Sequence, residues 1–349
     1  AEVSVSSGKL PCPSVDEILA CQLSNWYERF RNLPKEEYRR TRVTIKSAIL
    51  QVPQHFIDYI LSDGVNLPKG VNDVSTYISK VSTDDEWGED DGDNDSDNSK
   101  EMFDLSELTE SIQLKLDSLG GEIMPKLNWS SPKDASWING GSLKCHTPGD
   151  VYILLKSSDF ILHDILHAFD NARGERPSNF QYQLILRQWC NFNPSMEFRC
   201  FVWNRSVIAV SQRNHTQYFP HLQDQLYSIE TNILDFFDDY VYDNFSESGN
   251  YCFDVYIDKN NLIWLIDFNV WGSQTDSLLF SWEELIEVSL QSHVNICDIP
   301  CPQVRIVKTK NEVHHDPLAS YRAPIDVVDL ATASDPDIMA FREFMTSGK

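Results

Sequence analysis

The stretch that decides the fold is Tyr251-Cys-Phe-Asp-Val-Tyr-Ile-Asp-Lys-Asn-Asn-Leu-Ile-Trp-Leu-Ile-Asp-Phe-Asn269. Two apolar runs, 251–257 and 262–269, flank the polar residues 258–261, so the pattern predicts a β-hairpin. In the register of a four-residue turn, Ile257 faces Leu262 and Asp254 faces Leu265. Because side chains alternate along a strand, Asp267 and Asn269 are then expected on the same face as Asp254.

Two carboxylates and an amide on one face of an apolar hairpin are costly to bury unless positive charge neutralises them. One solution is Mg2+, a hard cation that binds oxygen ligands and completes its shell with water and phosphate oxygens. Another is a set of ion pairs between the two aspartates and Lys or Arg side chains of a neighbouring strand. The spacing leaves both solutions open.

Cationic side chains lie inside apolar, strand-like segments upstream of the hairpin: Lys126, Arg187 and Arg199. A single Lys or Arg in such a strand usually extends to the surface. Three of them, together with the acidic hairpin, favour a cleft that binds phosphate groups. No glycine-rich phosphate loop is present, since Gly120-Gly121 and Gly140-Gly141 are typical of turns.

The rest of the chain mixes helical and strand patterns without a regular alternation, which predicts the α+β class. Helices are expected at 15–31, from Pro53 onward, and at 103–119, 222–240 and 282–287. Strands are expected at 43–52, 121–129, 151–156, 181–189, 196–203 and 206–211. Residues 291–349 look mostly irregular.

The chain is strongly acidic, with a formal charge of −24 over 349 residues. Nine of its Asp and Glu residues lie between Asp84 and Asp97, a stretch without Lys or Arg that predicts a disordered loop. This charge argues against direct nucleic-acid binding and suits a basic protein partner, or solubility alone. No apolar run approaches the roughly 18 residues of a membrane span, so a cytoplasmic location is expected. A monomer is expected as well.

The eight cysteines are scattered, as reduced core thiols are. His293, Cys297 and Cys301, with His314 and His315, raise the alternative of a zinc site. Their spacing is wider than that of most zinc sites, and the prolines beside Cys301 favour a plain loop. Cys190 is interpreted as a packed thiol.

Several blocks of the chain resemble the cell division cycle protein 123 (D123) family. In order, they are Val43-Thr-Ile-Lys-Ser47, Pro125-Lys-Leu-Asn-Trp-Ser130, Leu155-Lys-Ser-Ser-Asp-Phe160, Glu197-Phe-Arg-Cys-Phe-Val202, Ser211-Gln-Arg213, Thr216-Gln-Tyr218, Trp264-Leu-Ile-Asp-Phe-Asn269, Thr275-Asp-Ser-Leu-Leu-Phe280, Trp282-Glu-Glu-Leu285, Tyr321-Arg322 and Val328-Asp-Leu330. The blocks span roughly residues 20–330. The chain departs from the family pattern at Val270-Trp271, and residues 1–14 match no family block.

The resemblance implies an ATP-grasp-like fold with two lobes around a nucleotide cleft, binding ATP and Mg2+. It also implies an assembly chaperone that acts on the gamma subunit of eukaryotic translation initiation factor two. By position in the motifs, the expected Mg2+ ligands are Asp254, Asp267 and Asn269. The expected nucleotide-binding residues are Lys126, Asn128, Arg187, Gln188, Trp189, Cys190, Glu197 and Arg199.

Alternative functions remain open at this point. One is an active ATP-grasp ligase or kinase, although no nucleophile with a partnered base stands out in the sequence. Another is a scaffold whose acidic loop binds basic proteins without a nucleotide. The expected organisation is a flexible tail (1–14), an N-terminal lobe (15–180) containing the acidic loop (84–100), a C-terminal ATP-grasp lobe (181–290) and an irregular extension (291–349).

The extension is a candidate interface, because it mixes apolar and charged side chains. These are Leu318, Tyr321, Ile325, Val327 and Val328 among Arg322, Asp326 and Asp329. The simpler alternative is that this segment packs back over the body of the protein.

Overall fold

The computed structural model describes residues 12–75, 103–291 and 302–321. The predicted acidic loop (84–100) lies outside the described residues. So do most of the predicted tail, the residues beyond 321, and His293, Cys297 and Cys301 of the zinc alternative. No helix in the described part is both long enough and apolar enough to span a membrane.

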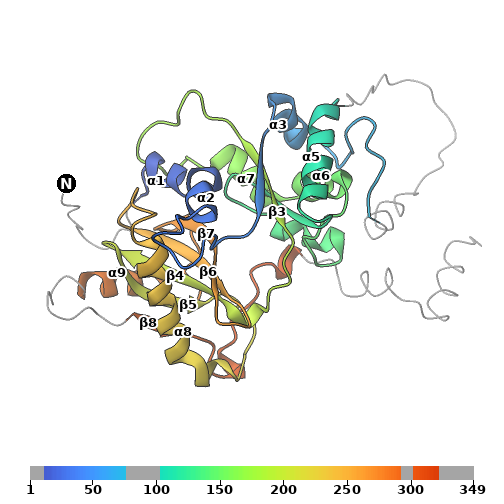
Figure 1. The fold of residues 1–349 in the computed structure, drawn as a ribbon. Coiled ribbons are helices and arrows are strands. Elements are labelled where there is room, and N and C mark those ends of the chain that lie inside the picture. Colours follow the sequence, from blue (N-terminus) through green and yellow to red (C-terminus); the bar gives the residue numbers. More distant parts are fainter. Residues whose placement is uncertain (1–11, 76–102, 292–301, 322–349) are drawn as a thin grey trace, which may run out of the picture.

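A three-stranded antiparallel sheet forms one half of the described fold (Figure 1). Its order is β1 (Ser47–Gln51), β3 (Gln183–Gln188), β2 (Ile123–Leu127). Four helices pack with this sheet around an apolar core: α3 (Gln54–Leu61), α5 (Ser106–Ser118), α6 (Pro148–Lys156) and α7 (Asp159–His167). The core explains why these helices form, since each contributes buried apolar side chains to it.

A five-stranded sheet forms the other half, in the order β7 (Ile263–Val270), β6 (Tyr251–Ile257), β4 (Glu197–Trp203), β5 (Ser206–Gln212), β8 (Gln303–Arg305). The neighbouring strands are antiparallel except β5 and β8. On one face it shares a core with α1 (Val15–Ala20), α2 (Leu23–Arg31) and α8 (Leu222–Phe236). The other face packs against Trp271, Phe280 and α9 (Trp282–Gln291).

One short segment joins the two sheets. Val43 accepts a hydrogen bond from the Leu265 amide of β7 at 2.7 Å, and the Thr44 hydroxyl donates to the Leu265 carbonyl at 2.8 Å. A few residues later the same segment becomes β1 and pairs with β3. The predicted strand 43–52 is therefore shared between two sheets, which brings β7 close to β3.

The predicted hairpin is present, but its predicted register is wrong. Ile257 pairs with Ile263 rather than Leu262, and a bulge then places Asp254 directly opposite Asp267. The turn is one residue shorter than predicted, because the Asp258 amide donates to the Leu262 carbonyl at 2.9 Å and leaves residues 259–261 between the paired ends. The Asp258 side chain accepts hydrogen bonds from the amides of Asn260 and Leu262, and Asn261 has a φ of 59°. The extra residue of β7 at the bulge is Ile266, whose insertion brings the two carboxylates face to face.

The prediction of a strand at 151–156 is wrong, because these residues belong to α6. Thr147 caps this helix, in a capping box with Asp150, and Pro148 occupies the first turn. The helix is buried on all sides from Pro148 to Leu155. A buried helix and a buried strand both have a continuous apolar sequence, so periodicity could not separate them.

Two predicted helices differ in detail. The helix predicted at 15–31 is divided into α1 and α2 at Cys21–Gln22, with Ser14 capping α1. The helix predicted at 222–240 is α8 followed by a wide π turn, Phe237–Val241. The structure adds α7 and β8, which the sequence analysis did not predict.

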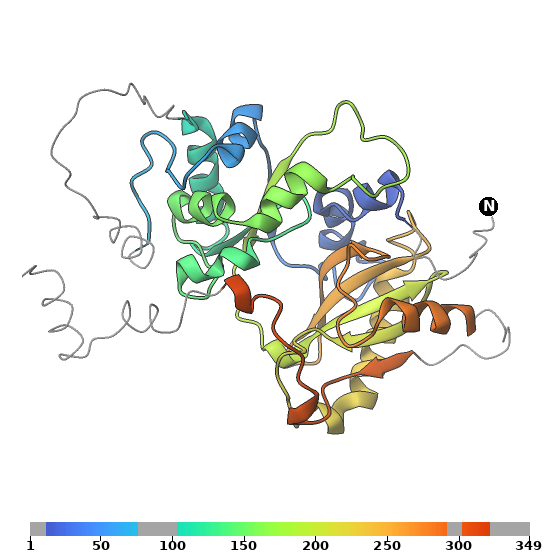
Figure 2. The same ribbon diagram turned by 180° about the vertical axis from the view of Figure 1, so that it is seen from behind.

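The described C-terminal segment, 302–321, runs from β8 back to the helical half of the molecule (Figure 2). Ile306 and Val307 are buried in the core, and the His314 amide donates to the His215 carbonyl at 3.0 Å. At its end, the ring of Tyr321 contacts Phe160 of α7 with centroids 6.1 Å apart. For Tyr321, the alternative of packing against the body is thus observed.

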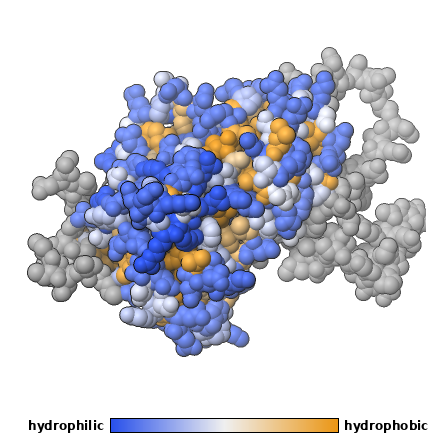
Figure 3. Space-filling view, in the orientation of Figure 1, coloured by the Kyte–Doolittle hydropathy of each residue, from blue (hydrophilic) through white to orange (hydrophobic). Residues whose placement is uncertain are grey.

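The molecular face in Figure 3 is mostly hydrophilic, with small apolar areas between the polar ones.

Candidate nucleotide site

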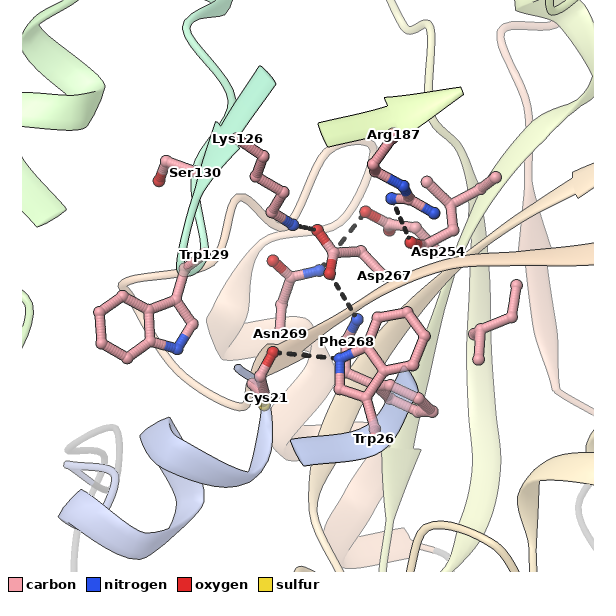
Figure 4. Close-up of polar contacts among 12 residues, drawn as sticks. Cys21, Trp26, Lys126, Trp129, Ser130, Arg187, Asp254, Asp267, Phe268 and Asn269 are labelled. Carbon is pink, nitrogen blue, oxygen red and sulfur yellow. Dashed lines mark hydrogen bonds and ion pairs between the residues drawn. The ribbon is translucent and has the colours of Figure 1, made fainter. Parts of the chain in front are cut away.

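A cavity of about 640 Å3 lies between the two sheets. Strands β2 and β3 of the smaller sheet and β6 and β7 of the larger one contribute to its walls (Figure 4). Most of the predicted site residues line it: Lys126, Arg187, Gln188, Trp189, Cys190, Glu197, Asp254, Asp267 and Asn269. Residues from distant parts of the chain therefore meet where the sequence analysis expected a cleft.

Asn128 and Arg199 are not among the residues that line the cavity. Asn128 is fully buried at the end of β2, where its Oδ1 accepts a hydrogen bond from the Gln183 amide at 2.9 Å. Arg199 lies behind Asp254 and also donates to the carbonyl of Asp276 at 2.7 Å. Both side chains support residues of the wall, and direct contact with a nucleotide stays a prediction for them.

Two arginines hold Asp254, one on the neighbouring strand β4 and one just after β5. Arg199 of β4 donates a hydrogen bond to each carboxylate oxygen, with Nε–Oδ1 at 2.7 Å and Nη2–Oδ2 at 2.8 Å. Arg213, at the end of β5, places its Nε 3.2 Å from Oδ2. Burial alone raises the pKa of an aspartate, but these two guanidinium groups hold the pKa of Asp254 well below its usual range. Asp254 is therefore a fixed negative charge.

Asp267 forms an ion pair with Lys126, whose side chain reaches across the cavity from β2 (Figure 4). Lys126 is only 2 % exposed, and burial lowers its pKa while Asp267 opposes that change. Asn269 joins the group, since its Nδ2 lies 3.4 Å from Oδ2 of Asp254. The three residues predicted as metal ligands are thus close neighbours.

Arg187 of β3 is the least satisfied charge in the cavity. It is 2 % exposed, and its Nη1 donates to the carbonyl of Ile266, the bulged residue of β7, at 2.7 Å. Among the described residues, its Nε and Nη2 have no hydrogen-bond partner. Burial lowers the pKa of Arg187. An unpartnered buried guanidinium is costly, and it matches the planar arrangement of donors that binds a phosphate or carboxylate.

The ion-pair alternative left open by the sequence is therefore observed for both aspartates. The described residues contain no cluster of three His, Cys, Asp or Glu side chains that could hold a metal. The donor set at this point is two carboxylates and one amide, and each carboxylate oxygen can accept more than one contact. Oxygen donors of this kind fit Mg2+ when phosphate oxygens complete the shell.

The sequence analysis missed two cationic residues of the lining, Lys133 and Arg213. Arg213 lies at the end of β5, and its Nη1 contacts Glu197 at 3.2 Å. Lys133 begins the 3-10 helix η2 (Lys133–Asn139) after an irregular turn. Arg213 belongs to a quoted family block, whereas no pattern in the sequence marks Lys133.

The charges of the lining are nearly balanced, with one more cation than carboxylates, unlike those of the whole chain. Its cations are Lys126, Lys133, Arg187 and Arg213, against the carboxylates Asp254, Asp267 and Glu197. Arg199 adds a further cation behind Asp254. In a chain of net charge −24, a lining with this many cations favours an anionic ligand.

The wall formed by residues 189–192, between β3 and β4, is aromatic. Trp189 and Phe192 line it, and Phe192 stacks on Tyr256 with ring centroids 4.3 Å apart. Cys190 is half-buried, and burial raises the pKa of its thiol, as expected for a packed cysteine. A planar, apolar wall beside a cationic region suits a ligand with an aromatic ring and a charged tail.

The fold and the cavity together define the class of the protein. It is an α+β protein with a sheet on either side of a cleft, as predicted.

Comparison with known proteins then identifies the family. A family model described as D123 matches residues 26–331. A translation initiation factor eIF2 assembly protein from Xenopus tropicalis is 39 % identical over 327 residues, covering 92 % of this chain and 93 % of that protein. A cell division cycle protein 123 from Phaeosphaeria nodorum is 39 % identical over 259 residues, covering 72 % of this chain and 67 % of that protein.

The solved structure of Cdc123 from Schizosaccharomyces pombe is similar to this one, with a TM-score of 0.65 and 33 % identity. The match covers 84 % of this chain and 98 % of the Schizosaccharomyces pombe chain. The chain belongs to the D123 family.

Proposed function

We propose that this chain binds Mg-ATP in the cavity between its sheets and assists the assembly of translation initiation factor eIF2 by binding the gamma subunit. The observation that carries the nucleotide part is the buried guanidinium of Arg187, which lines the cavity with two unpartnered donors. A phosphate oxygen would satisfy them. The names of the relatives from Xenopus tropicalis and Phaeosphaeria nodorum support the assembly part.

The lining residues suggest a division of roles. Lys126, Lys133 and Arg187 would contact the phosphates, and the aromatic wall at 189–192 would accept the base. Asp254, Asp267 and Asn269 would hold Mg2+, which neutralises phosphate charge when it is bound. The ion pair between Lys126 and Asp267 keeps both groups compensated in the protein alone.

The predicted organisation also stays a proposal. Its boundary at residue 181 falls just before β3, the strand that pairs with β1 and β2 of the smaller sheet. A cytoplasmic location and a monomeric state are proposed with it.

ATP affinity is expected to fall as the pH rises above 7, because Lys133 loses its proton in the free protein. The positive charge of Arg213, together with burial, lowers the pKa of Lys133 to about 7. The charges of Glu197 and Asp254 raise the pKa of Lys133, and the charge of Arg199 lowers it further. Bound phosphates would favour charged Lys133 and raise its pKa again. Binding then takes up a proton above pH 7, and below it Lys133 is already charged.

Calorimetry with Mg-ATP at several pH values measures this effect. The affinity should fall by up to about tenfold per pH unit above 7 until the pKa of the bound state is reached. A Lys133→Met variant should bind more weakly at pH 7 and show a flatter profile. Equal slopes for the two proteins would contradict the role of Lys133.

Capture on the gamma subunit tests the assembly part. Purified eIF2 gamma subunit on beads should retain the full-length chain, and a chain ending at Lys310 should be retained much less. This truncation keeps β8 and the buried residues Ile306 and Val307, so the fold should persist. It removes the candidate interface from Leu318 onward.

The truncated chain is first checked by circular dichroism and ATP binding. If it is folded and still captured as well as the full-length chain, the C-terminal segment is not the contact surface. If the full-length chain is not captured at all, the proposed partner is wrong.

A further inference from the structure

The turn that follows β2 forms part of the cavity wall. Trp129, Ser130 and Ser131 line the cavity, and the Leu127 amide donates to the Ser130 carbonyl at 2.9 Å to close the turn. Asn128 within it has a positive φ of 22°, which is uncommon for a residue other than glycine, although asparagine adopts positive φ more often than most. A strained turn persists only when its surroundings hold it in place.

One anchor of this turn is strand β3. The Asn128 amide donates to the Gln183 carbonyl at 3.1 Å, and the Gln183 amide donates back to Asn128 Oδ1 at 2.9 Å. This reciprocal pair fixes the start of the turn to the sheet. It also explains why Asn128 is buried away from the cavity.

The other anchor is Asp164 of α7. Its carboxylate accepts a hydrogen bond from the Ser130 amide at 2.8 Å and another from the Ser130 hydroxyl, also at 2.8 Å. Asp164 is 6 % exposed, and burial raises its pKa to about 7, although the Ser130 bonds and the charge of Lys126 oppose the increase. A buried carboxylate whose two oxygens both bind one residue defines the position of that residue closely.

Helix α7 is itself fixed to the segment that carries Lys133. Asp134, the residue after Lys133, accepts hydrogen bonds from the Ser158 hydroxyl and the Asp159 amide, each at 2.6 Å. These groups form the start of α7. The helix therefore holds the wall at two places: Ser130 through Asp164, and η2 through Asp134.

We propose that Asp164 is a positioning residue: by holding Ser130, it keeps the turn 128–131 and the adjacent Lys126 in the arrangement that a nucleotide phosphate chain needs. This rests on the proposed ATP function of the cavity. Asp164 does not line the cavity and would not contact the ligand. Its effect should therefore appear on the phosphate part of the ligand alone, because the aromatic wall for the base lies at 189–192.

The test compares Mg-ATP with adenosine by calorimetry in three variants of the full chain. Asp164→Ala removes both acceptors, and Asp164→Asn keeps one acceptor for the Ser130 amide and offers an amide donor to the Ser130 oxygen. Asp150→Ala is the matched control. Asp150 is fully buried and accepts from the amides of Ser75, His146 and Thr147 at 2.7, 2.9 and 3.2 Å, away from the cavity.

Asp164→Ala should weaken Mg-ATP by about 10- to 100-fold, the usual range for loss of a supporting residue, and leave adenosine unchanged. Asp164→Asn should keep most of the Mg-ATP affinity that Asp164→Ala loses. Asp150→Ala should lower the melting temperature but preserve the ratio of the two affinities. If Asp164→Ala does not fold, Ser130→Ala, which removes one of the two bonds, should give a smaller loss that is again specific to ATP.

Equal losses for ATP and adenosine, or no loss for either, would overturn the positioning role. A wild-type chain that binds adenosine but gains nothing from the phosphates would refute this proposal together with the proposed function. If wild type prefers ATP and Asp164→Ala retains that preference, only the positioning role fails.

Discussion

Replacing Arg187 with Met is expected to abolish most ATP binding while leaving the nucleotide-free protein as stable as wild type, or more stable. Arg187 carries a buried charge with two unpartnered donors; its one hydrogen bond, to the Ile266 carbonyl, and the nearby charge of Asp267 compensate it in part. Replacing a buried ion pair by apolar side chains of similar volume is often neutral, or stabilising by about 1–4 kcal/mol, and a buried charge without a full set of partners is costly to keep. The same exchange removes the forked donor that phosphate would bind.

Calorimetry should show a loss of ATP affinity on the order of 100-fold, since a charged hydrogen bond to a buried group is worth about 1.5–3 kcal/mol. Thermal unfolding without nucleotide measures the stability of the variant, whose melting temperature should equal or exceed that of wild type. Arg187→Lys is the control, because it keeps the positive charge without the forked donors. Its ATP affinity should lie between those of wild type and Arg187→Met. Unchanged ATP affinity in Arg187→Met would show that this residue does not contact the ligand. A large drop in melting temperature would show that its bond to Ile266 outweighs the cost of the buried charge.

Asp267→Asn is expected to remove most of the Mg2+ dependence of ATP binding. Asn keeps an acceptor for Lys126 and loses the negative charge, so it tests the metal assignment with less disturbance than Ala. In wild type, ATP should bind far more tightly with Mg2+ than without it. In the variant the two affinities should approach each other, and Mg-ATP should weaken by about tenfold or more.

The variant also leaves the charge of Lys126 without its partner carboxylate, so the nucleotide-free protein should melt at a lower temperature. Glu197→Gln is the matched control. Glu197 lines the same cavity and pairs with Arg213, but it is outside the predicted metal set. It should keep the Mg2+ dependence. If Asp267→Asn keeps it as well, Asp267 serves only as the partner of Lys126.

The hairpin at 251–269 could be predicted because two apolar runs on either side of a short polar turn have few other solutions. Its register could not. Ile266, the extra residue at the bulge, is apolar like its neighbours, and nothing in the local pattern marks it. The predicted proximity of Asp254 and Asp267 survives this error, because the bulge shifts β7 so that the two residues lie directly opposite each other.

The arrangement of cations around the cavity was less predictable, because it depends on contacts between distant segments. Lys133 and Arg213 reach the cavity only through the placement of η2 and of the end of β5. Arg199 was predicted from its apolar strand to face the ligand. The antiparallel pairing of β4 with β6 sets it opposite Asp254 instead, whose carboxylate accepts from its Nε and Nη2.

The smaller sheet ends at β1, which pairs with β3 alone among the described strands. Strand edges are sites where identical chains can join by hydrogen bonding, and this edge is protected in several ways. It is only five residues long, Pro53 follows it closely, and Lys46 precedes it. The Ser47 amide already donates to the Tyr27 hydroxyl at 2.6 Å, so it offers no donor to another strand. The fold therefore includes its own resistance to edge-to-edge aggregation at the strand that joins its two halves.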